Sequence, residues 1–385
     1  MDEMTRSEQR GKPKVAIVHD WLTNMGGAEK VVLAFHEAFP DAPIYTSTYN
    51  PAKTPAFDEL DVRTTYLQKL PGFLRKLHKF MPFLRVRAFR SLDLSEYDII
   101  LSSSSAESKQ VRKTRDDQIH ICYCHTPIRY YWSHYDEYRA DPGFGKFNWA
   151  VRLLMPFIVP AQKRADYKAA QQVDFFIGNS STVAERITKY YDRPADVLHP
   201  PVETGRFSPS KKRDDFYIAL ARHIPYKRLD LAITAVNELG VKLRVFGNGS
   251  ERKALERLAG PTVTFFEGSP SPEDQKIIVN SLNSAKGFIF PAEEDFGIVQ
   301  VEAMAGGTPV IAYGVGGSRD IVIEDETGVF FEEQTTHSVI AAIQRAESIS
   351  FSPDLIRKHA ETFDKAIFIR RIQDYVDAHR TSQDL

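Results

Sequence analysis

The feature that most constrains the fold is the regular alternation of short, apolar, β-rich runs with segments of helical periodicity. Residues 14–19 form the first such run, and apolar residues then recur at helical spacing between Ala28 and Phe35. This alternation is typical of parallel sheets that are covered by helices. The sequence therefore predicts an α/β protein.

The alternation runs through the whole chain with one interruption. Residues 199–212 are rich in proline and polar side chains, which breaks the periodicity and predicts a linker. Before the linker, further strands are predicted at 98–102, 119–125, 175–179 and 196–199. After it, strands are predicted at 216–221, 241–246, 263–266, 287–290, 309–312 and 329–331. Thr182 and Glu185 form a candidate capping box for the helix after Asn179.

Two Rossmann-like halves in series are therefore expected. A chain of 385 residues suits two domains, and we predict an N-terminal domain at 1–205 and a C-terminal domain at 206–360. Residues 361–385 are predicted to form a helix that packs back on the first domain. The apolar face of that helix consists of Ile369, Ile372 and Val376. Ligands of such sheets bind beyond the carboxyl ends of the strands, so two facing halves predict a cleft between them.

Charge and composition exclude several classes of protein. The formal net charge is −1, which argues against a nucleic-acid partner held by a basic field. Apolar residues make up 42% of the chain and charged residues 26%, as in globular proteins. No apolar run approaches the roughly 18 residues of a membrane span, and the polar first dozen residues do not resemble a signal peptide. A cytoplasmic location is expected.

The two cysteines lie in a predicted strand beside two histidines. Cys122 and Cys124 are too close for an ordinary disulfide and do not have the spacing of a zinc-binding pair. His120 and His125 flank them, but the alternation of the segment favours a strand with two small buried thiols over a metal site.

The most specific segment for chemistry is 290–313. A predicted strand ends at Phe290, a loop carries Glu294, and the following helix carries Glu302. This spacing places both carboxylates near a helix N-terminus, where exposed amides attract an anion such as a sugar-nucleotide diphosphate. Carboxylates there can accept hydrogen bonds from sugar and ribose hydroxyls. The alternative is that the two glutamates only favour the helix dipole.

Cations and glycines follow other strands. Arg222 and Lys227 come after the first strand of the second domain, where both can reach the mouth of its sheet, although a surface pair of cations is the alternative. Gly26 and Gly27 follow the first strand of the chain, where glycine lets the backbone approach a phosphate closely. Gly247 follows another strand, but no third glycine completes a dinucleotide fingerprint.

These motifs resemble family 4 of the glycosyltransferases, whose fold is called GT-B. The matching positions are Glu294, Phe296, Gly297, Glu302, Ala303 and Gly306. The resemblance implies that 1–205 binds the acceptor and 206–360 the nucleotide sugar. Within the second domain, it implies that Glu294 contacts the donor sugar and Glu302 the ribose. It also implies that backbone amides near Phe296, Gly297 and Ile298 touch sugar and phosphate.

Further roles follow from the same resemblance. Arg222 and Lys227 would neutralise the diphosphate leaving group, with Ala221 where the family often has glycine. His125, at a strand end, would lie beside the donor sugar, although a histidine there can also be structural. Asp20 lies near the acceptor or caps a loop. Arg129, Tyr130 and Trp132 are acceptor-side candidates that packing explains equally well.

The run from Cys124 to Trp132 looks like a subgroup of bacterial mannosyltransferases that build cell-surface polysaccharide. It implies GDP-mannose as the donor and a glycan or polyprenyl-linked acceptor. The family is retaining and is thought to use no carboxylate nucleophile. The chain has no aspartate–x–aspartate motif, so we expect neither a metal nor a cofactor. The alternatives are another GT-B sugar-nucleotide enzyme, such as an epimerase or a UDP-sugar transferase, and a non-catalytic sugar-nucleotide-binding scaffold.

One local stretch is strongly basic. Between Arg63 and Arg90 there are eight lysines or arginines and no acidic residue, interleaved with leucine and phenylalanine. Such a stretch suits an anionic membrane surface, with Pro71 and Pro82 dividing it into short helices. The alternative is a solvated pair of amphipathic helices.

Overall fold

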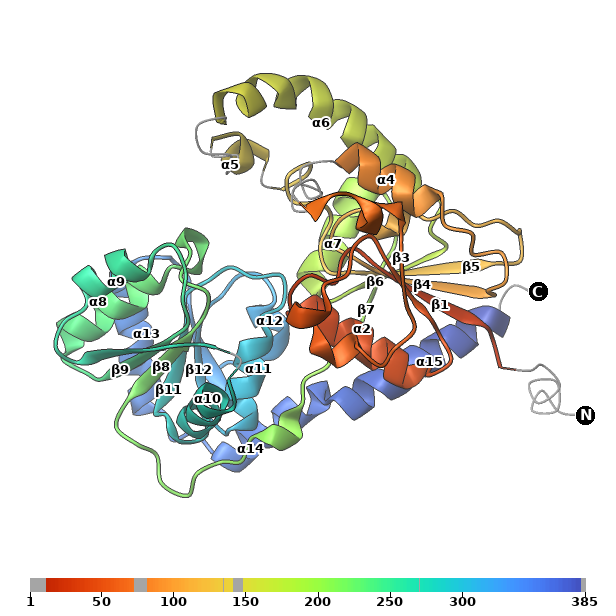
Figure 1. Ribbon diagram of the computed structural model, residues 1–385. Helices are drawn as coiled ribbons and strands as arrows, with labels where there is room; N and C mark the ends of the chain where they lie inside the picture. Colours follow the sequence, from red (N-terminus) through yellow and green to blue (C-terminus); the bar gives the residue numbers. More distant parts are fainter. Residues whose placement is uncertain (1–11, 73–81, 134, 141–147, 270, 382–385) are drawn as a thin grey trace, which may run out of the picture. The chain divides into compact units, whose positions relative to one another are not determined.

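The computed structural model describes residues 12–72, 82–133, 135–140, 148–269 and 271–381. The chain divides into two compact units, one comprising Met1–Leu198 with Ile369–Leu385 and the other His199–Phe368 (Figure 1). Within the described ranges, no helix combines the length and the apolar character needed to cross a bilayer.

The first unit is built on a seven-stranded sheet with the order β3-β2-β1-β4-β5-β6-β7, and all neighbouring strands are parallel. The strands are β1 (Val15–His19), β2 (Ile44–Thr46), β3 (Val62–Thr64), β4 (Ile99–Ser104), β5 (Ile119–Cys124), β6 (Phe175–Gly178) and β7 (Asp196–Val197). The five strands predicted for this part of the chain are confirmed. The sequence prediction missed β2 and β3, because three residues are too few to show an alternating pattern.

Helices flank this sheet. They are α2 (Gly27–Ala38), α4 (Pro82–Arg90), α5 (Tyr135–Ala140), α6 (Asn148–Ala170) and α7 (Ser181–Tyr191). The predicted capping box at Thr182 is wrong. Ser180 is the N-cap instead, because it has extended backbone angles and its hydroxyl accepts a hydrogen bond from the Val183 amide at 3.2 Å.

The last helix, α15 (Lys365–Thr381), begins in the second unit and continues into the first. Ile372 and Val376 are fully buried. The side-chain amide of Gln373 donates a hydrogen bond to the Ala38 carbonyl at 2.8 Å, and the Tyr375 hydroxyl donates one to Asp196 at 2.7 Å. The helix thus contacts the end of α2 and strand β7.

The second unit holds a six-stranded parallel sheet with the order β10-β9-β8-β11-β12-β13. Its strands are β8 (Tyr217–Leu220), β9 (Leu243–Phe246), β10 (Val263–Phe266), β11 (Gly287–Phe290), β12 (Val310–Tyr313) and β13 (Gly328–Phe331). All six were predicted. Its helices are α8 (Leu229–Leu239), α9 (Arg252–Leu258), α10 (Pro272–Ser284), α11 (Ile298–Ala305), α12 (Ser318–Ile321), α13 (Thr336–Ser348) and α14 (Pro353–Ala360).

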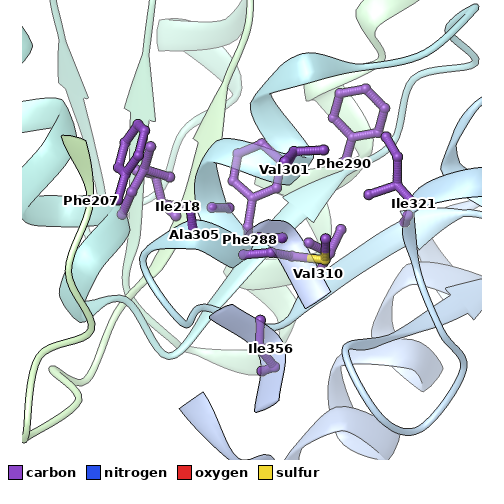
Figure 2. Close-up of a cluster of buried hydrophobic side chains, with 14 of the residues drawn as sticks. Phe207, Ile218, Phe288, Phe290, Val301, Ala305, Val310, Ile321 and Ile356 are labelled. Atoms are coloured by element: carbon purple, nitrogen blue, oxygen red, sulfur yellow. The ribbon is translucent and has the colours of Figure 1, made fainter. Parts of the chain in front are cut away.

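Each face of this sheet packs against its own set of helices. Alternate strand residues such as Ile218 and Phe288 join Val301 of α11 and Ile356 of α14 in one core (Figure 2). Residues of the opposite parity, including Tyr217, join α8 and α13 in a second core. With both faces covered, the loops beyond the carboxyl ends of the strands are left for a ligand, and β8 and β11 are neighbours at the centre.

Candidate functional site

Two predicted site residues of the second unit are in direct contact. Lys227 ends a short 3-10 helix, Pro225–Lys227, in the loop after β8, and Glu294 lies in the loop after β11. The Lys227 ammonium forms an ion pair with a carboxylate oxygen of Glu294. The Lys227 side chain is 9% exposed and that of Glu294 is 22% exposed, so the pair is shielded but remains open on the carboxylate side.

Arg222 lies in the same loop as Lys227 and is exposed. Its guanidinium donates a hydrogen bond to the Tyr226 hydroxyl at 3.3 Å. The Lys227 ammonium lies 5.0 Å from the centre of the Tyr226 ring, within cation–π range. Tyr226 therefore contacts both cations, a role that the sequence prediction did not assign.

The loop that carries Glu294 depends on two glycines after β12. Gly316 has φ +75°, and a Cβ there would lie 2.3 Å from the Glu294 carbonyl oxygen. The Gly317 amide donates a hydrogen bond to the same oxygen at 2.9 Å. A side chain at either position would displace this loop. The sequence prediction missed their role, although a glycine pair directly after a strand is a usable signal.

The first turn of α11 follows Glu294 closely. Gly297 is the N-cap in a left-handed conformation with φ +97°, and the helix begins at Ile298. The Phe296 ring is buried and stacks on His199 with centroids 5.4 Å apart, so this side chain belongs to the core. Glu302 lies in the second turn and is partly exposed.

Gly247 has a packing role. Its φ is +124°, and a Cβ there would lie 2.0 Å from the Ala221 carbonyl oxygen. Next to it, the His223 amide donates a hydrogen bond to the Asn248 carbonyl at 2.9 Å. The loop after β9 therefore packs directly on the loop that carries Arg222, and glycine permits this close approach.

In the first unit, His125 follows β5 and is partly buried. Its Nε2 lies 2.7 Å from the Ser103 hydroxyl, and its ring packs edge-on against Tyr123. Gly26 is the N-cap of α2, which begins at Gly27. A Cβ on Gly26 would lie 3.0 Å from a carboxylate oxygen of Glu29, so this glycine also leaves room for that side chain.

Asp20 caps a loop, which confirms one of its two interpretations. Its carboxylate accepts hydrogen bonds from the amides of Ser105, Ala106 and Ser108 at 2.7–2.9 Å. It also accepts one from the Ser105 hydroxyl at 3.1 Å. These contacts fix the loop that follows β4, and the carboxylate is fully enclosed, with Asp20 1% exposed.

Buried polar contacts involve Arg85, which the sequence prediction placed on a basic surface, and the acceptor-side candidates Tyr130 and Trp132. Arg85 is 1% exposed and pairs with Glu107 at 2.6 Å, and Glu107 also accepts a hydrogen bond from Tyr130. The Trp132 indole donates a hydrogen bond to buried Asp166 at 2.8 Å. Packing is therefore the supported interpretation of Tyr130 and Trp132.

The predicted basic face between Arg63 and Arg90 needs correction in part. Arg85 is buried in an ion pair with Glu107, and Phe89 is fully buried, so neither faces solvent. Residues 73–81 of this stretch lie outside the described residues. Phe83, Leu84 and Arg87 of α4 are exposed.

The prediction of a strand with two small buried thiols is confirmed. Cys122 and Cys124 are free and buried in β5, and burial raises the pKa of the Cys122 thiol to about 12. The His120 ring lies 2.8 Å from the Ser102 hydroxyl, and burial lowers the pKa of His120 to about 4. In the ranges that the structure covers, no three histidine, cysteine or acidic side chains cluster in a way that could hold a metal ion.

Comparison with known families gives two adjoining matches. A model described as Glycosyltransferase Family 4 matches residues 25–206, and one described as Glycosyl transferases group 1 matches residues 203–365. Together they span residues 25–365, which include most of each unit.

Two curated relatives are 28% and 26% identical to this chain over less than half of its length. A D-inositol 3-phosphate glycosyltransferase of Mycobacteroides abscessus is 28% identical over 46% of this chain and 45% of its own length. A GDP-mannose-dependent alpha-(1-6)-phosphatidylinositol monomannoside mannosyltransferase of Mycolicibacterium smegmatis is 26% identical over 43% of this chain and 53% of its own length. The matched region thus spans about half the length of these relatives.

Solved structures match over nearly the whole chain. Sucrose-phosphate synthase from Thermosynechococcus elongatus has a TM-score of 0.70 at 17% identity, covering 96% of this chain and 100% of that one. An Anabaena protein in complex with UDP and glucose has a TM-score of 0.67 at 15% identity, covering 95% and 99%. These likenesses confirm the predicted α/β fold with two Rossmann-like domains of the GT-B type. With both family models matched in series, the chain belongs to glycosyltransferase family 4.

Proposed function

We propose that this family 4 member is a retaining mannosyltransferase. It would transfer mannose from GDP-mannose to a hydroxyl of a glycan or polyprenyl-linked glycan, without a divalent metal. The observation that carries the proposal is the Lys227–Glu294 ion pair, with Arg222 in the same loop, beyond the carboxyl ends of β8 and β11. The mannose donor is supported by the run from Cys124 to Trp132 and by the GDP-mannose-dependent relative.

The cations would stabilise the leaving group. Breaking the bond between sugar and phosphate leaves negative charge on the diphosphate, and groups that stay cationic lower the energy of that charge. Arg222 can bind a phosphate with two N–H groups, and Lys227 acts as a compact point charge. The amide end of α11 adds partial positive charge beside them.

The carboxylates would position the donor. One Glu294 oxygen pairs with Lys227, and the other can accept a hydrogen bond from a sugar hydroxyl. Glu302 is partly exposed in the second turn of α11, where it can accept hydrogen bonds from ribose. We assign no nucleophile, because the departing phosphate can itself take the acceptor proton on the same face of the sugar.

Thermal stabilisation by GDP, UDP and ADP tests the base, and turnover of the matching donors tests the reaction. We expect GDP to raise the melting temperature most, and GDP-mannose to release GDP only when an acceptor is present. Greater stabilisation by UDP or ADP would contradict the donor assignment. Conversion of the sugar without nucleotide release would show an epimerase, and intact polysaccharide assembly in cells carrying Glu294→Ala would show a scaffold.

We also propose that the first unit contacts an anionic membrane, where a polyprenyl-linked acceptor would reside. Besides the exposed residues of α4, the N-terminal half of α6 exposes large apolar side chains beside the cation Arg152. The exposed fraction is 77% for Phe157 and 68% for Trp149. Apolar and aromatic anchors next to basic groups are typical of helices that lie in a membrane interface.

Co-sedimentation with vesicles tests this contact. The intact chain should bind vesicles containing anionic lipid more strongly than zwitterionic vesicles, and the double variant Trp149→Ser/Phe157→Ser should bind about tenfold more weakly. The matched control is Leu355→Ser, since Leu355 is 63% exposed in the second unit. Binding that does not change with anionic lipid content would contradict the proposal.

A further inference from the structure

A chain of four polar side chains links the start of α2 to the predicted catalytic histidine. Nε2 of His19 lies 3.7 Å from the Glu29 carboxylate, and Nδ1 of His19 lies 3.1 Å from the Ser103 hydroxyl. The same hydroxyl lies 2.7 Å from Nε2 of His125. The strand register explains the arrangement, because His19 of β1 pairs with Ser103 of β4.

The Ser103 backbone settles where one His19 proton lies. Nδ1 of His19 is 3.2 Å from the Ser103 carbonyl oxygen, which can only accept a hydrogen bond. Nδ1 must therefore carry a proton. On the other side of the ring, an unprotonated Nε2 would turn its lone pair toward the Glu29 carboxylate, whereas a protonated Nε2 would donate toward it.

The charges that face His19 favour the doubly protonated ring. His19 is 2% exposed, and burial alone opposes a charge. Glu29 from α2 outweighs this effect, with smaller contributions from Asp20 and the Ser103 carbonyl, so the pKa of His19 is raised above its ordinary value. Glu29 thus favours the protonated form of the buried His19 ring.

The state of His19 determines what the Ser103 hydroxyl can do. A hydroxyl has one proton and accepts through its lone pairs. Because Nδ1 of His19 carries a proton, the Ser103 hydroxyl can only accept from it, and Nε2 of His125 is the nitrogen toward which the serine proton can turn. A neutral His125 that accepts at Nε2 carries its own proton on Nδ1.

We propose that Glu29, His19 and Ser103 are positioning residues that hold His125 neutral, in the tautomer with its proton on Nδ1. The hydrogen bond from Ser103 fixes the orientation of the imidazole ring that a donor sugar would meet. This last step rests on the proposed function, whereas the tautomer itself does not. Gly26 contributes by leaving space beside the Glu29 carboxylate.

The test is nitrogen NMR of the full chain with 15N-labelled histidine at neutral pH. The chain has 11 histidines, and the variant His125→Gln identifies the His125 signals by their loss. We expect a protonated Nδ1 and an unprotonated Nε2 on His125 in the unaltered protein. A protonated Nε2 there would overturn the proposal, whether or not mannose transfer is ever observed.

Two variants sharpen the result. Ser103→Ala should give a mixture of His125 tautomers, and Glu29→Gln should remove the second proton from His19 with little change in shape. With an active donor, Ser103→Ala should lower kcat by about 10- to 100-fold with less than about a threefold change in KM, whereas Glu29→Gln leaves the Nδ1 proton of His19 in place and should have a smaller effect. Unchanged His125 signals in both variants would also overturn the proposal.

The matched control is Ser102→Ala on the same strand. Ser102 is buried like Ser103, but its hydroxyl contacts His120 at 2.8 Å. Its substitution should leave the His125 signals unchanged and kcat within about twofold of the original value. A shift of His125 in this control as large as in Ser103→Ala would show general disturbance of the strand and would contradict the specific role of Ser103.

Discussion

The polar side chains near the carboxyl ends of the strands differ between the two sheets. In the first unit, the polar groups there are buried and bonded to one another, as with Asp20 and the chain from Glu29 to His125. In the second unit, the corresponding loops hold an exposed Arg222 and a Lys227–Glu294 pair whose carboxylate is partly open. The polar groups described here are therefore largely enclosed in the first unit and more accessible in the second.

This division follows from what each environment does to a charge. A buried polar network keeps a single arrangement, because each unmade hydrogen bond is costly there. A cation that must neutralise a diphosphate has to remain accessible to it. The predictions below change one property at a time in one of the two regions.

The largest effect is expected for Lys227→Met in the second unit. Removing the cation should lower kcat/KM by about 1000-fold, since it removes charge that faces the leaving group. Lys242→Met is the control, because Lys242 is 67% exposed and pairs with Asp215 at 3.6 Å. Steady-state kinetics of both variants measure the difference, and equal losses would contradict the assigned role.

In the first unit, Asp20→Ala should act on stability. It leaves three backbone amides without their acceptor, which should cost about 3 kcal/mol of unfolding free energy. Asp93→Ala is the control, because Asp93 accepts a hydrogen bond from the Ser95 amide at the exposed surface and its loss should change stability far less. Urea unfolding of both variants tests this, and a loss at Asp20 no larger than at Asp93 would refute it.

In the second unit, Gly316→Ala should lower both stability and activity. The added Cβ meets the Glu294 carbonyl at a position with φ +75°, so we expect a loss of about 2 kcal/mol and a lower kcat. Gly205→Ala has open space around its added Cβ and serves as the control. Normal activity in Gly316→Ala would show that this loop does not position Glu294.

The smallest expected effect is the contribution of His120 to the pH dependence of the unfolding free energy. Its pKa is lowered to about 4 by burial, so the unfolded chain takes up the proton first as the pH falls below 6.5. Its stabilising contribution is therefore full above pH 6.5 and declines toward pH 4, by about 1 kcal/mol at pH 5.5. His19 has the opposite shift and opposes this slope.

Comparing the unfolding free energy of His120→Gln with that of the unaltered chain isolates the contribution of His120 to stability. Unfolding free energies at pH 7 and pH 5.5 should converge for the two proteins as the pH falls. If the difference between them stayed constant over this range, His120 would not be held neutral by burial.

Much of the second unit could be predicted from the sequence because its signals are local. Its strands follow apolar runs, and Glu294, Arg222 and Lys227 each lie just after a strand. The contact between Lys227 and Glu294 could not be predicted, because it depends on β8 and β11 being neighbours. Gly316 was missed because its φ and its approach to another loop appear only in three dimensions.

The first unit was less predictable for the same reason. His125 was identified by its place at a strand end, but its partners His19 and Ser103 come from two other strands. Arg85 was assigned to a basic surface because its buried partner Glu107 lies far along the chain. Local patterns identify elements and single residues, whereas buried networks depend on strand order.

The most direct test of the account is GDP release from GDP-mannose in the presence of acceptor, measured with and without excess chelator. If Arg222, Lys227 and the amide end of α11 neutralise the diphosphate, the chelated enzyme should keep its full rate. Loss of activity on chelation, with recovery when magnesium or manganese is added back, would contradict the account.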